Sequence, residues 1–150
     1  MNLSWYRTLH KPPLNPPSEI FTPVWSVMYS LIFLSLCILL FTKTDADKKL
    51  GITFFVIQLI LNLSWSPVFF YFHNITFSFI IIILLLIFIT LTIISFYQIS
   101  KISAYLLIPY LIWVTFAAYL NFGIMILNWL LNLFQRRYKV IMFNITFNFS

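Results

Sequence analysis

The stretch that decides the fold is Ile75–Ile99, ITFSFIIIILLLIFITLTIISFYQI, which runs for 25 residues without a charged side chain. A helix needs about 20 apolar residues to cross roughly 30 Å of hydrocarbon, so this stretch is long enough to span a bilayer once. An apolar run of this length is typical of a transmembrane helix rather than of a soluble domain. We therefore interpret it as a membrane-spanning helix.

Three further charge-free runs flank this stretch, and together the four runs predict four crossings. Two of the flanking runs are 23 residues long, and the last is 33 residues long. Because 33 residues exceed one straight span, we expect a crossing from about Ser103 to Asn128 and then a segment along the interface, where Trp129 would lie comfortably. The three runs are Ile20–Thr42, Leu50–Phe72 and Ile102–Phe134.

The connections between the runs are short, which forces neighbouring helices to be antiparallel. They are the charged segment Lys43–Lys49, the pair His73-Asn74 and the residues around Lys101. The predicted fold class is all-α: an integral, multi-pass membrane bundle of four transmembrane helices with both termini on one side. We divide the chain into a proline-rich segment (1–19), the bundle (20–132) and a tail of unknown role (133–150).

The composition supports a membrane location. Hydrophobic residues make up 62% of the chain and charged residues 8%, whereas soluble domains carry about 25% charged residues. The net charge of +6 comes from Lys and Arg residues scattered between the apolar runs, so we expect lipid rather than nucleic acid as the partner. The abundance of Phe and Ile and the scarcity of Ala and Gly suggest a bacterial membrane. Five positive charges on the side of the termini against four on the other leave the orientation open.

The residues that usually carry chemistry lie outside the spans. The carboxylates are Glu19, Asp45 and Asp47, and the histidines are His10 and His73. They form no acid pair, no nucleophile beside a base and no cluster with metal-ligand spacing. We therefore predict a protein that is not an enzyme and has no cofactor and no metal.

Aromatic and amide side chains within the spans are the better candidates for a site. Trp25, Trp65 and Trp113 fall in three different runs, and Asn62 shares a helical face with Trp65. Each Trp alone is as consistent with an aromatic belt at the interface as with a pocket. The Asn62 amide needs a partner in hydrocarbon, either on another helix or on a ligand. Converging Trp and Tyr residues would suit a flat, apolar, aromatic ligand.

Close packing of membrane helices requires small residues. The sequence offers a limited set of candidates for these contacts, namely Ser26, Ser30, Ala117, Ala118 and Gly123.

The segment before the first span carries four prolines within six residues. Trp5–Pro17 reads WYRTLHKPPLNPP, and we expect it to form a stiff, extended strip that cannot be helical. Such a strip could lie over the mouth of the bundle as a lid, and the alternative is a disordered tail.

Several motifs resemble the TspO/MBR family of tryptophan-rich sensory (translocator) proteins. They occur in the family's order and cover about residues 5 to 129. The first group is Lys11-Pro12, Asn15-Pro16-Pro17, Phe21, Pro23-Val24-Trp25 and Tyr29; the second is Gln58-Leu59, Asn62, Trp65 and Pro67–Phe70; the third is Tyr97-Gln98, Pro109–Trp113, Leu120-Asn121 and Asn128-Trp129.

The resemblance implies a five-helix fold, usually dimeric, that binds tetrapyrroles such as protoporphyrin, sterols and benzodiazepine-type ligands. It implies a receptor or carrier with an aromatic pocket inside the bundle. Carried over by position, the ligand-binding residues would be Trp25, Tyr29, Asn62, Trp65, Trp113, Ala117 and Leu120. The lid residues would be Lys11, Pro12, Asn15, Pro16 and Pro17.

The family has a whole helix before the position of Trp5, where this sequence has four residues. We expect either a start site further upstream or a truncated product, in which one pocket wall and part of the dimer surface would be missing. Two alternatives to the receptor hypothesis follow: a membrane remnant that binds nothing, and the light-driven porphyrin breakdown with which some members of the family are linked.

Overall fold

The computed structural model describes the backbone of residues 3–148 and the side chains of residues 5–17, 19–131, 133–134 and 137. Within this part of the chain, all regular structure is helical, and four segments are long and apolar enough to cross a membrane. The predicted all-α membrane bundle is therefore confirmed. The helices are α1 (Leu3–Thr8), α2 (Ser18–Phe41), α3 (Lys49–Phe70), α4 (Ile75–Tyr97), α5 (Lys101–Leu106) and α6 (Ile108–Asn148).

Side chains in the short connections satisfy the free backbone groups at the helix ends. The Lys48 ammonium donates to the carbonyl oxygens of Leu40 (3.0 Å) and Thr42 (2.6 Å) at the end of α2. Asn74 caps α4, because its side-chain oxygen accepts a hydrogen bond from the Phe77 amide at 2.9 Å. The positive φ of His73 (54°) makes the tight turn between α3 and α4. The helices end at the connections that the sequence predicted, namely the charged segment Lys43–Lys49 and the pair His73-Asn74.

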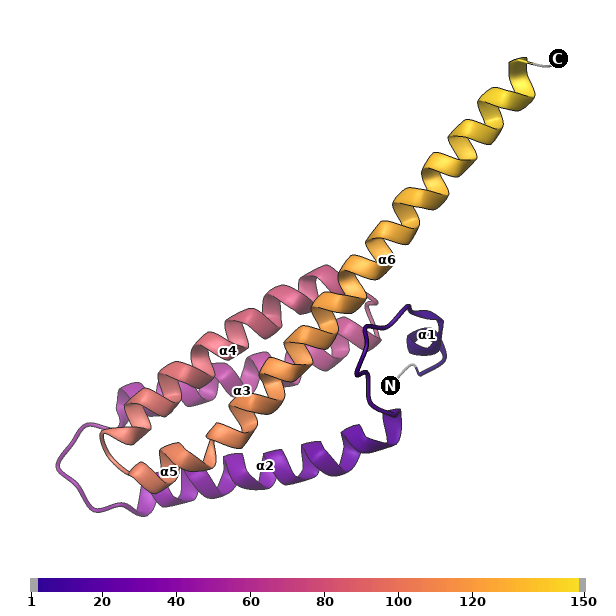
Figure 1. Ribbon diagram of the computed structural model, residues 1–150. Helices are drawn as coiled ribbons and strands as arrows, with labels where there is room; N and C mark the ends of the chain where they lie inside the picture. Colours follow the sequence, from indigo (N-terminus) through magenta and orange to yellow (C-terminus); the bar gives the residue numbers. More distant parts are fainter. Residues whose placement is uncertain (1–2, 149–150) are drawn as a thin grey trace.

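Pro109 explains why the fourth span consists of two helices. A proline has no amide hydrogen, and its ring clashes with the carbonyl four residues earlier, so it kinks or breaks a helix that precedes it and fits best in a first turn. The chain accordingly breaks at Leu107, and Pro109 is the second residue of α6. The short helix α5 is thereby free to pack on α2 at the end of the bundle far from the N-terminal segment (Figure 1).

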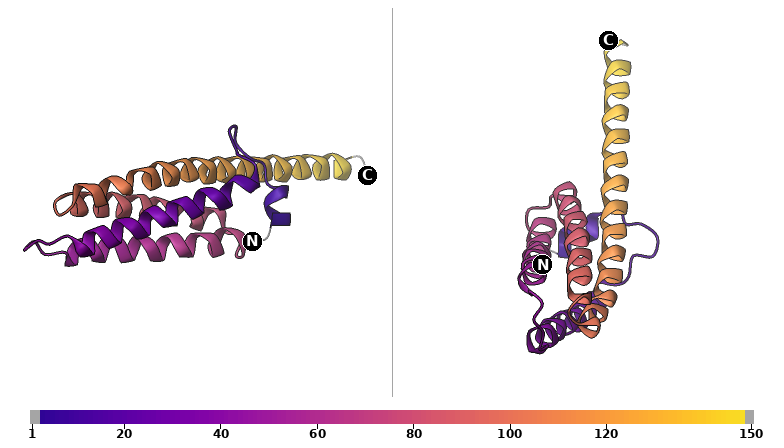
Figure 2. Two further views of the ribbon diagram at one scale, coloured as in Figure 1. Left: turned by 90° about the horizontal axis from the view of Figure 1, so that it is seen from below. Right: turned by 90° about the vertical axis from the view of Figure 1, so that its left-hand side faces the viewer.

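The prediction that the chain runs along the membrane interface after Asn128 is wrong. Helix α6 runs from Ile108 to Asn148, 41 residues in all, and extends beyond the other helices (Figures 1 and 2). At 1.5 Å per residue it is about 60 Å long, about twice the thickness of the hydrocarbon core. The physical reason is that no proline or glycine follows Gly123 to end the helix.

The N-terminal segment is also less extended than expected. Residues 5–8 lie in α1, since no proline lies within that stretch, and the chain turns at Pro13-Leu14, where Leu14 has a φ of 68°. The prolines themselves are non-helical, as predicted. The segment lies at the end of the bundle where α2 begins and α6 leaves it (Figure 1).

Helices α3 and α4 form an antiparallel hairpin that packs against α6, whereas α2 is attached mainly through α5. Ser35 and Ser103 join α2 and α5 by hydrogen bonds. The Ser35 hydroxyl donates to the Ser103 carbonyl at 2.7 Å, and the Ser103 hydroxyl donates to the Ser35 carbonyl in return. Ser26 and Ser30 do not pack against another helix of this chain: both are exposed and donate to carbonyls of their own helix.

Candidate functional site

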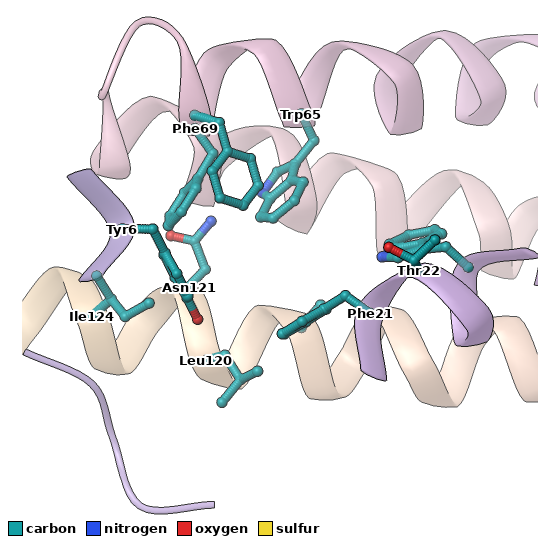
Figure 3. Close-up of a pocket in the computed structure, with 11 residues that line it drawn as sticks. Tyr6, Phe21, Thr22, Trp65, Phe69, Leu120, Asn121 and Ile124 are labelled. Atoms are coloured by element: carbon teal, nitrogen blue, oxygen red, sulfur yellow. The ribbon is translucent and has the colours of Figure 1, made fainter. Parts of the chain in front are cut away.

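A cavity of about 120 Å³ lies between α1, α2, α3 and α6, beneath the N-terminal segment. Six of its eleven lining residues are aromatic, and none is charged. Figure 3 shows side chains converging on it from four helices, with Tyr6 reaching from α1 toward Asn121 of α6. The lining residues are Tyr6, Phe21, Thr22, Trp25, Trp65, Phe69, Phe70, Ala117, Leu120, Asn121 and Ile124.

Aromatic rings of α3 form one wall of the cavity and pack tightly on each other. Trp65 and Phe69 lie one helical turn apart and stack with their ring centres 5.2 Å apart. Phe70 meets Phe69 edge-on at 4.9 Å, and Tyr6 covers both rings edge-on from α1. The wall is therefore rigid and apolar, which is what a flat hydrophobic ligand requires.

Hydrogen bonds of Asn121, a residue of α6, connect this wall to α4. With its amide oriented by its hydrogen-bond network, the Asn121 oxygen accepts from the Trp65 indole nitrogen and from the Ser78 hydroxyl, each at 3.0 Å. Its nitrogen donates to the Ile75 carbonyl at 3.2 Å. Trp65 consequently presents its ring to the cavity, while its N–H is used within the protein.

Asn62 lies at the centre of a second, buried polar network. Its side-chain oxygen accepts from the Tyr29 hydroxyl at 2.7 Å, and its nitrogen donates to the Tyr110 hydroxyl at 2.9 Å. The Tyr110 hydroxyl in turn donates to the Gln58 side-chain oxygen at 3.0 Å. The buried Asn62 amide therefore has its partners on two other helices, which is one of the two arrangements that the sequence left open.

Most of the residues expected to bind a ligand lie close together in the structure, but not all of them line the cavity. Trp25, Trp65, Ala117 and Leu120 line the cavity, and Asn62 lines a small adjoining void of about 10 Å³. The two remaining residues lie outside the lining. Tyr29 is 39% exposed and packs on Trp25 with the ring centres 5.5 Å apart.

Trp113 stands behind the wall that α2 contributes. Its ring meets Phe21 edge-on at 6.0 Å and packs against Phe116 at 5.7 Å. Its buried indole nitrogen has no hydrogen-bond partner among the described residues. Trp113 thus supports Phe21, which itself faces the cavity.

Sequence reasoning did not assign seven of the lining residues to the site. For two of them, helical spacing was the available signal: Asn121 and Ile124 continue from Ala117 and Leu120 at intervals of three and four residues, so all four share one face of α6. Tyr6 carried no such signal, because its position depends on how α1 packs against α3. The residues not assigned are Tyr6, Phe21, Thr22, Phe69, Phe70, Asn121 and Ile124.

None of the expected lid residues lines the cavity, but two of them contact Tyr6, which does. The Tyr6 hydroxyl donates to the Asn15 side chain at 2.9 Å, and the Lys11 ammonium lies over the Tyr6 ring, 4.4 Å from its centre. Burial raises the pKa of Tyr6, and the hydrogen bond to Asn15 only partly opposes this, so the hydroxyl stays a neutral donor at physiological pH. Pro16 is half-buried and Pro17 is exposed at the start of α2.

The same segment is held on α6 at three points. Pro12 is buried against Gly123, where a side chain would have no room: a Cβ atom there would lie 2.6 Å from the proline ring. The Tyr119 hydroxyl donates to the Pro13 carbonyl at 3.1 Å. The Asn128 side chain pairs with the backbone of His10, accepting from its amide at 3.3 Å and donating to its carbonyl at 3.0 Å.

The part of the chain that the structure describes contains no group of three His, Cys, Asp or Glu side chains that could hold a metal. The site described above is an uncharged aromatic cavity inside a membrane bundle, bordered by Tyr6 of the N-terminal segment. The fold and the site thus define a multi-pass membrane protein with an internal apolar pocket.

Comparison with known proteins gives the family. The family model described as "TspO/MBR family" matches residues 1–127, and the chain belongs to that family. It is 44% identical to the tryptophan-rich protein TspO of Chlorobaculum tepidum over 127 residues, which cover 83% of this chain and 80% of the relative. It is 34% identical to a tryptophan-rich sensory protein of Cereibacter sphaeroides (83% and 77% covered) and 33% identical to the human translocator protein (80% and 72% covered). The predicted family membership is therefore confirmed.

Proposed function

We propose that this protein is a membrane receptor or carrier that binds a flat, largely apolar aromatic ligand of the tetrapyrrole class, such as protoporphyrin, in the cavity beneath the N-terminal segment. The observation that carries the proposal is the convergence of six aromatic rings on one uncharged cavity. Burial of apolar surface contributes about 25 cal/mol per Å², so an aromatic cavity favours a ligand with extended apolar faces.

The size of the cavity bears on how such a ligand would enter. At about 120 Å³ it resembles the apolar cavities of about 150 Å³ that hold one benzene ring. A tetrapyrrole is several times larger, so it requires the N-terminal segment to move away from α6. Such a movement breaks the hydrogen bonds of the segment to Tyr119 and Asn128 and separates Pro12 from Gly123. Local opening of this kind costs less free energy than global unfolding.

The names of the relatives support a receptor or carrier rather than an enzyme. They describe sensory proteins and translocator proteins. Both roles require reversible binding, which suits a cavity without charged or nucleophilic lining residues. Dimer formation, which the family resemblance implies, stays a prediction.

The test uses a substitution that fills the cavity and leaves all tryptophans in place. Ala117→Phe places a ring in the space that Trp25 and Trp65 enclose, whereas Thr115→Phe places the same ring on an exposed face of α6. We expect saturable quenching of tryptophan fluorescence by protoporphyrin in the wild type and in Thr115→Phe, and at least tenfold weaker binding in Ala117→Phe. Equal quenching in all three proteins would show partitioning into the membrane and would refute the proposal.

A further inference from the structure

The imidazole ring of His73 packs against the indole ring of Trp5, which belongs to the N-terminal helix α1. The ring centres are 4.2 Å apart and the ring planes are inclined by 31°, so the arrangement is closer to stacked than to edge-on. Trp5 also meets Phe69 edge-on at 5.6 Å, and Phe69 lines the cavity. The contact between Trp5 and His73 therefore joins α1 to the connection between α3 and α4, beside one wall of the cavity.

The end of α3 holds the backbone on both sides of His73, so His73 is the fixed partner in this contact. The Phe72 amide donates to the Pro67 carbonyl at 3.1 Å, and the Asn74 amide donates to the Val68 carbonyl at 3.2 Å. Helix α1 has six residues, and a helix of this length is not stable by itself in water. Its position consequently depends on the side-chain contacts that it makes with α3 and with the connection after α3.

His73 can change its charge near neutral pH, as histidines do between pH 5 and 8. It is exposed and lines an open groove together with Asn128 and Trp129 of α6, so protons from water reach it. A neutral imidazole only stacks on the indole of Trp5, whereas a protonated imidazole is a cation over an aromatic face, and tryptophan attracts cations more strongly than other aromatic residues do. The contact is therefore stronger when His73 is protonated.

The charged residues of α1 and of the segment that follows it are basic. Arg7 comes two positions after Trp5, so it points to another side of α1, and it is exposed to water. The Lys11 ammonium lies over the ring of Tyr6. His10 is exposed, and its backbone is paired with the Asn128 side chain of α6.

The other elements around His73 contain no Asp or Glu, namely α3, α4, α6 and the connection 71–74, in which Tyr71 is exposed. Lys49 lies at the far end of α3, and Arg136, the first charged residue of α6, comes seven residues or about 10 Å beyond Trp129. Glu19 is exposed on α2, which packs on α5 and α6. Because charges exposed to water are screened, the ring in direct contact with His73 decides the effect of its protonation.

We propose that His73 is a pH-sensitive switch: its protonation strengthens the contact with Trp5 and holds α1 on the connection between α3 and α4. When the solution on this side of the membrane is acidic, α1 stays in place and Tyr6 keeps its position in the lining of the cavity. Near neutral pH the contact is weaker, and α1 detaches more often. The switch is a property of the protein itself and does not depend on which ligand the cavity binds.

The test measures amide hydrogen exchange of residues 7–9 in nanodiscs of phosphatidylcholine at about pH 5.5 and about pH 7.5. The rates are expressed as protection factors, which removes the intrinsic pH dependence of exchange. The chain has two histidines, so His73→Asn and His10→Asn make the same change at each, and asparagine tolerates the positive φ of position 73. Trp5→Leu removes the aromatic face, and circular dichroism establishes that each variant is folded.

We expect the protection factors of the wild type and of His10→Asn to be about threefold higher at the acidic pH, or about 0.7 kcal/mol at 1.4 kcal/mol per decade. His73→Asn and Trp5→Leu should each give the same protection factors at both pH values. Repeating the measurement at high salt should leave the pH dependence of the wild type in place, since the two rings are in contact.

Equal protection of the wild type at both pH values would overturn the switch. A pH dependence that persists in His73→Asn would overturn it as well, and one that disappears in His10→Asn would assign the effect to the other histidine. A pH dependence that persists in Trp5→Leu would show that the charge of His73 does not act through the indole ring. If Trp5→Leu fails to fold, the two histidine variants decide the question by themselves.

Discussion

At the scale of single residues, the contact between Gly123 and Pro12 decides how closely the N-terminal segment lies on α6. A Cβ atom at Gly123 would lie 2.6 and 2.7 Å from two atoms of the rigid proline ring, so Gly123→Ala must push the segment away. Overpacking of this kind typically costs about 1–3 kcal/mol. We expect amide hydrogen exchange in residues 5–17 to become at least fivefold faster.

Gly51→Ala is the matched control for this substitution. A Cβ atom there would lie 3.2 Å from the Phe96 ring at the opposite end of the bundle, where a small movement of the ring relieves the contact. We expect no change of exchange in residues 5–17 for this variant. If Gly123→Ala exchanges at the rate of the wild type as well, Pro12 does not hold the segment on α6.

The network around Asn62 makes a second prediction about single residues. Tyr110→Phe removes the hydroxyl that joins Asn62 to Gln58 and leaves both amides with an unpaired buried atom. Such a loss typically costs about 1–3 kcal/mol. Tyr29→Phe removes one bond at the partly exposed edge of the network, for which membrane proteins lose about 0.6 kcal/mol on average. Equilibrium unfolding in mixed micelles should rank Tyr110→Phe as the more damaging change, and the reverse order would contradict this account.

At the scale of helices, the attachment of α2 depends on the paired hydroxyls of Ser35 and Ser103. Ser35 is completely buried against α5, so Ser35→Leu forces the two helices apart and should reduce the free energy of unfolding by about 1–3 kcal/mol. Ser30→Leu makes the same change on the exposed face of α2 and should stay within about 0.5 kcal/mol of the wild type. Equal losses in both variants would show that the Ser35–Ser103 contact is not what holds α2.

At the scale of the whole molecule, the four spans place α1 and the C-terminal part of α6 on one side of the membrane (Figure 1). In a Cys37→Ala background, cysteines introduced at Arg7 and Arg137 should react with a membrane-impermeant reagent from the same side. A cysteine at Asp45, in the connection between α2 and α3, should react only from the other side. Labelling of Arg7→Cys and Arg137→Cys from opposite sides would rule out an even number of crossings.

The sequence by itself determined the four spans, their antiparallel order and the family. Each of these depends on local properties: the length of a charge-free run, the shortness of a connection, or an ordered set of motifs. The same local information placed Trp65 and Asn62 on one face of α3. It misjudged the end of α6, because it assumed a boundary at the interface where no residue ends the helix.

Only the tertiary structure decided which aromatic side chains line the cavity. Periodicity states which residues share a face of one helix, but the packing between helices decides which faces meet. Helix α2 packs on α6 so that the ring of Phe21 meets that of Trp113, and Trp113 lies behind Phe21 instead of in the lining. In the same way, the packing of α1 on α3 brings Tyr6 into the lining of the cavity.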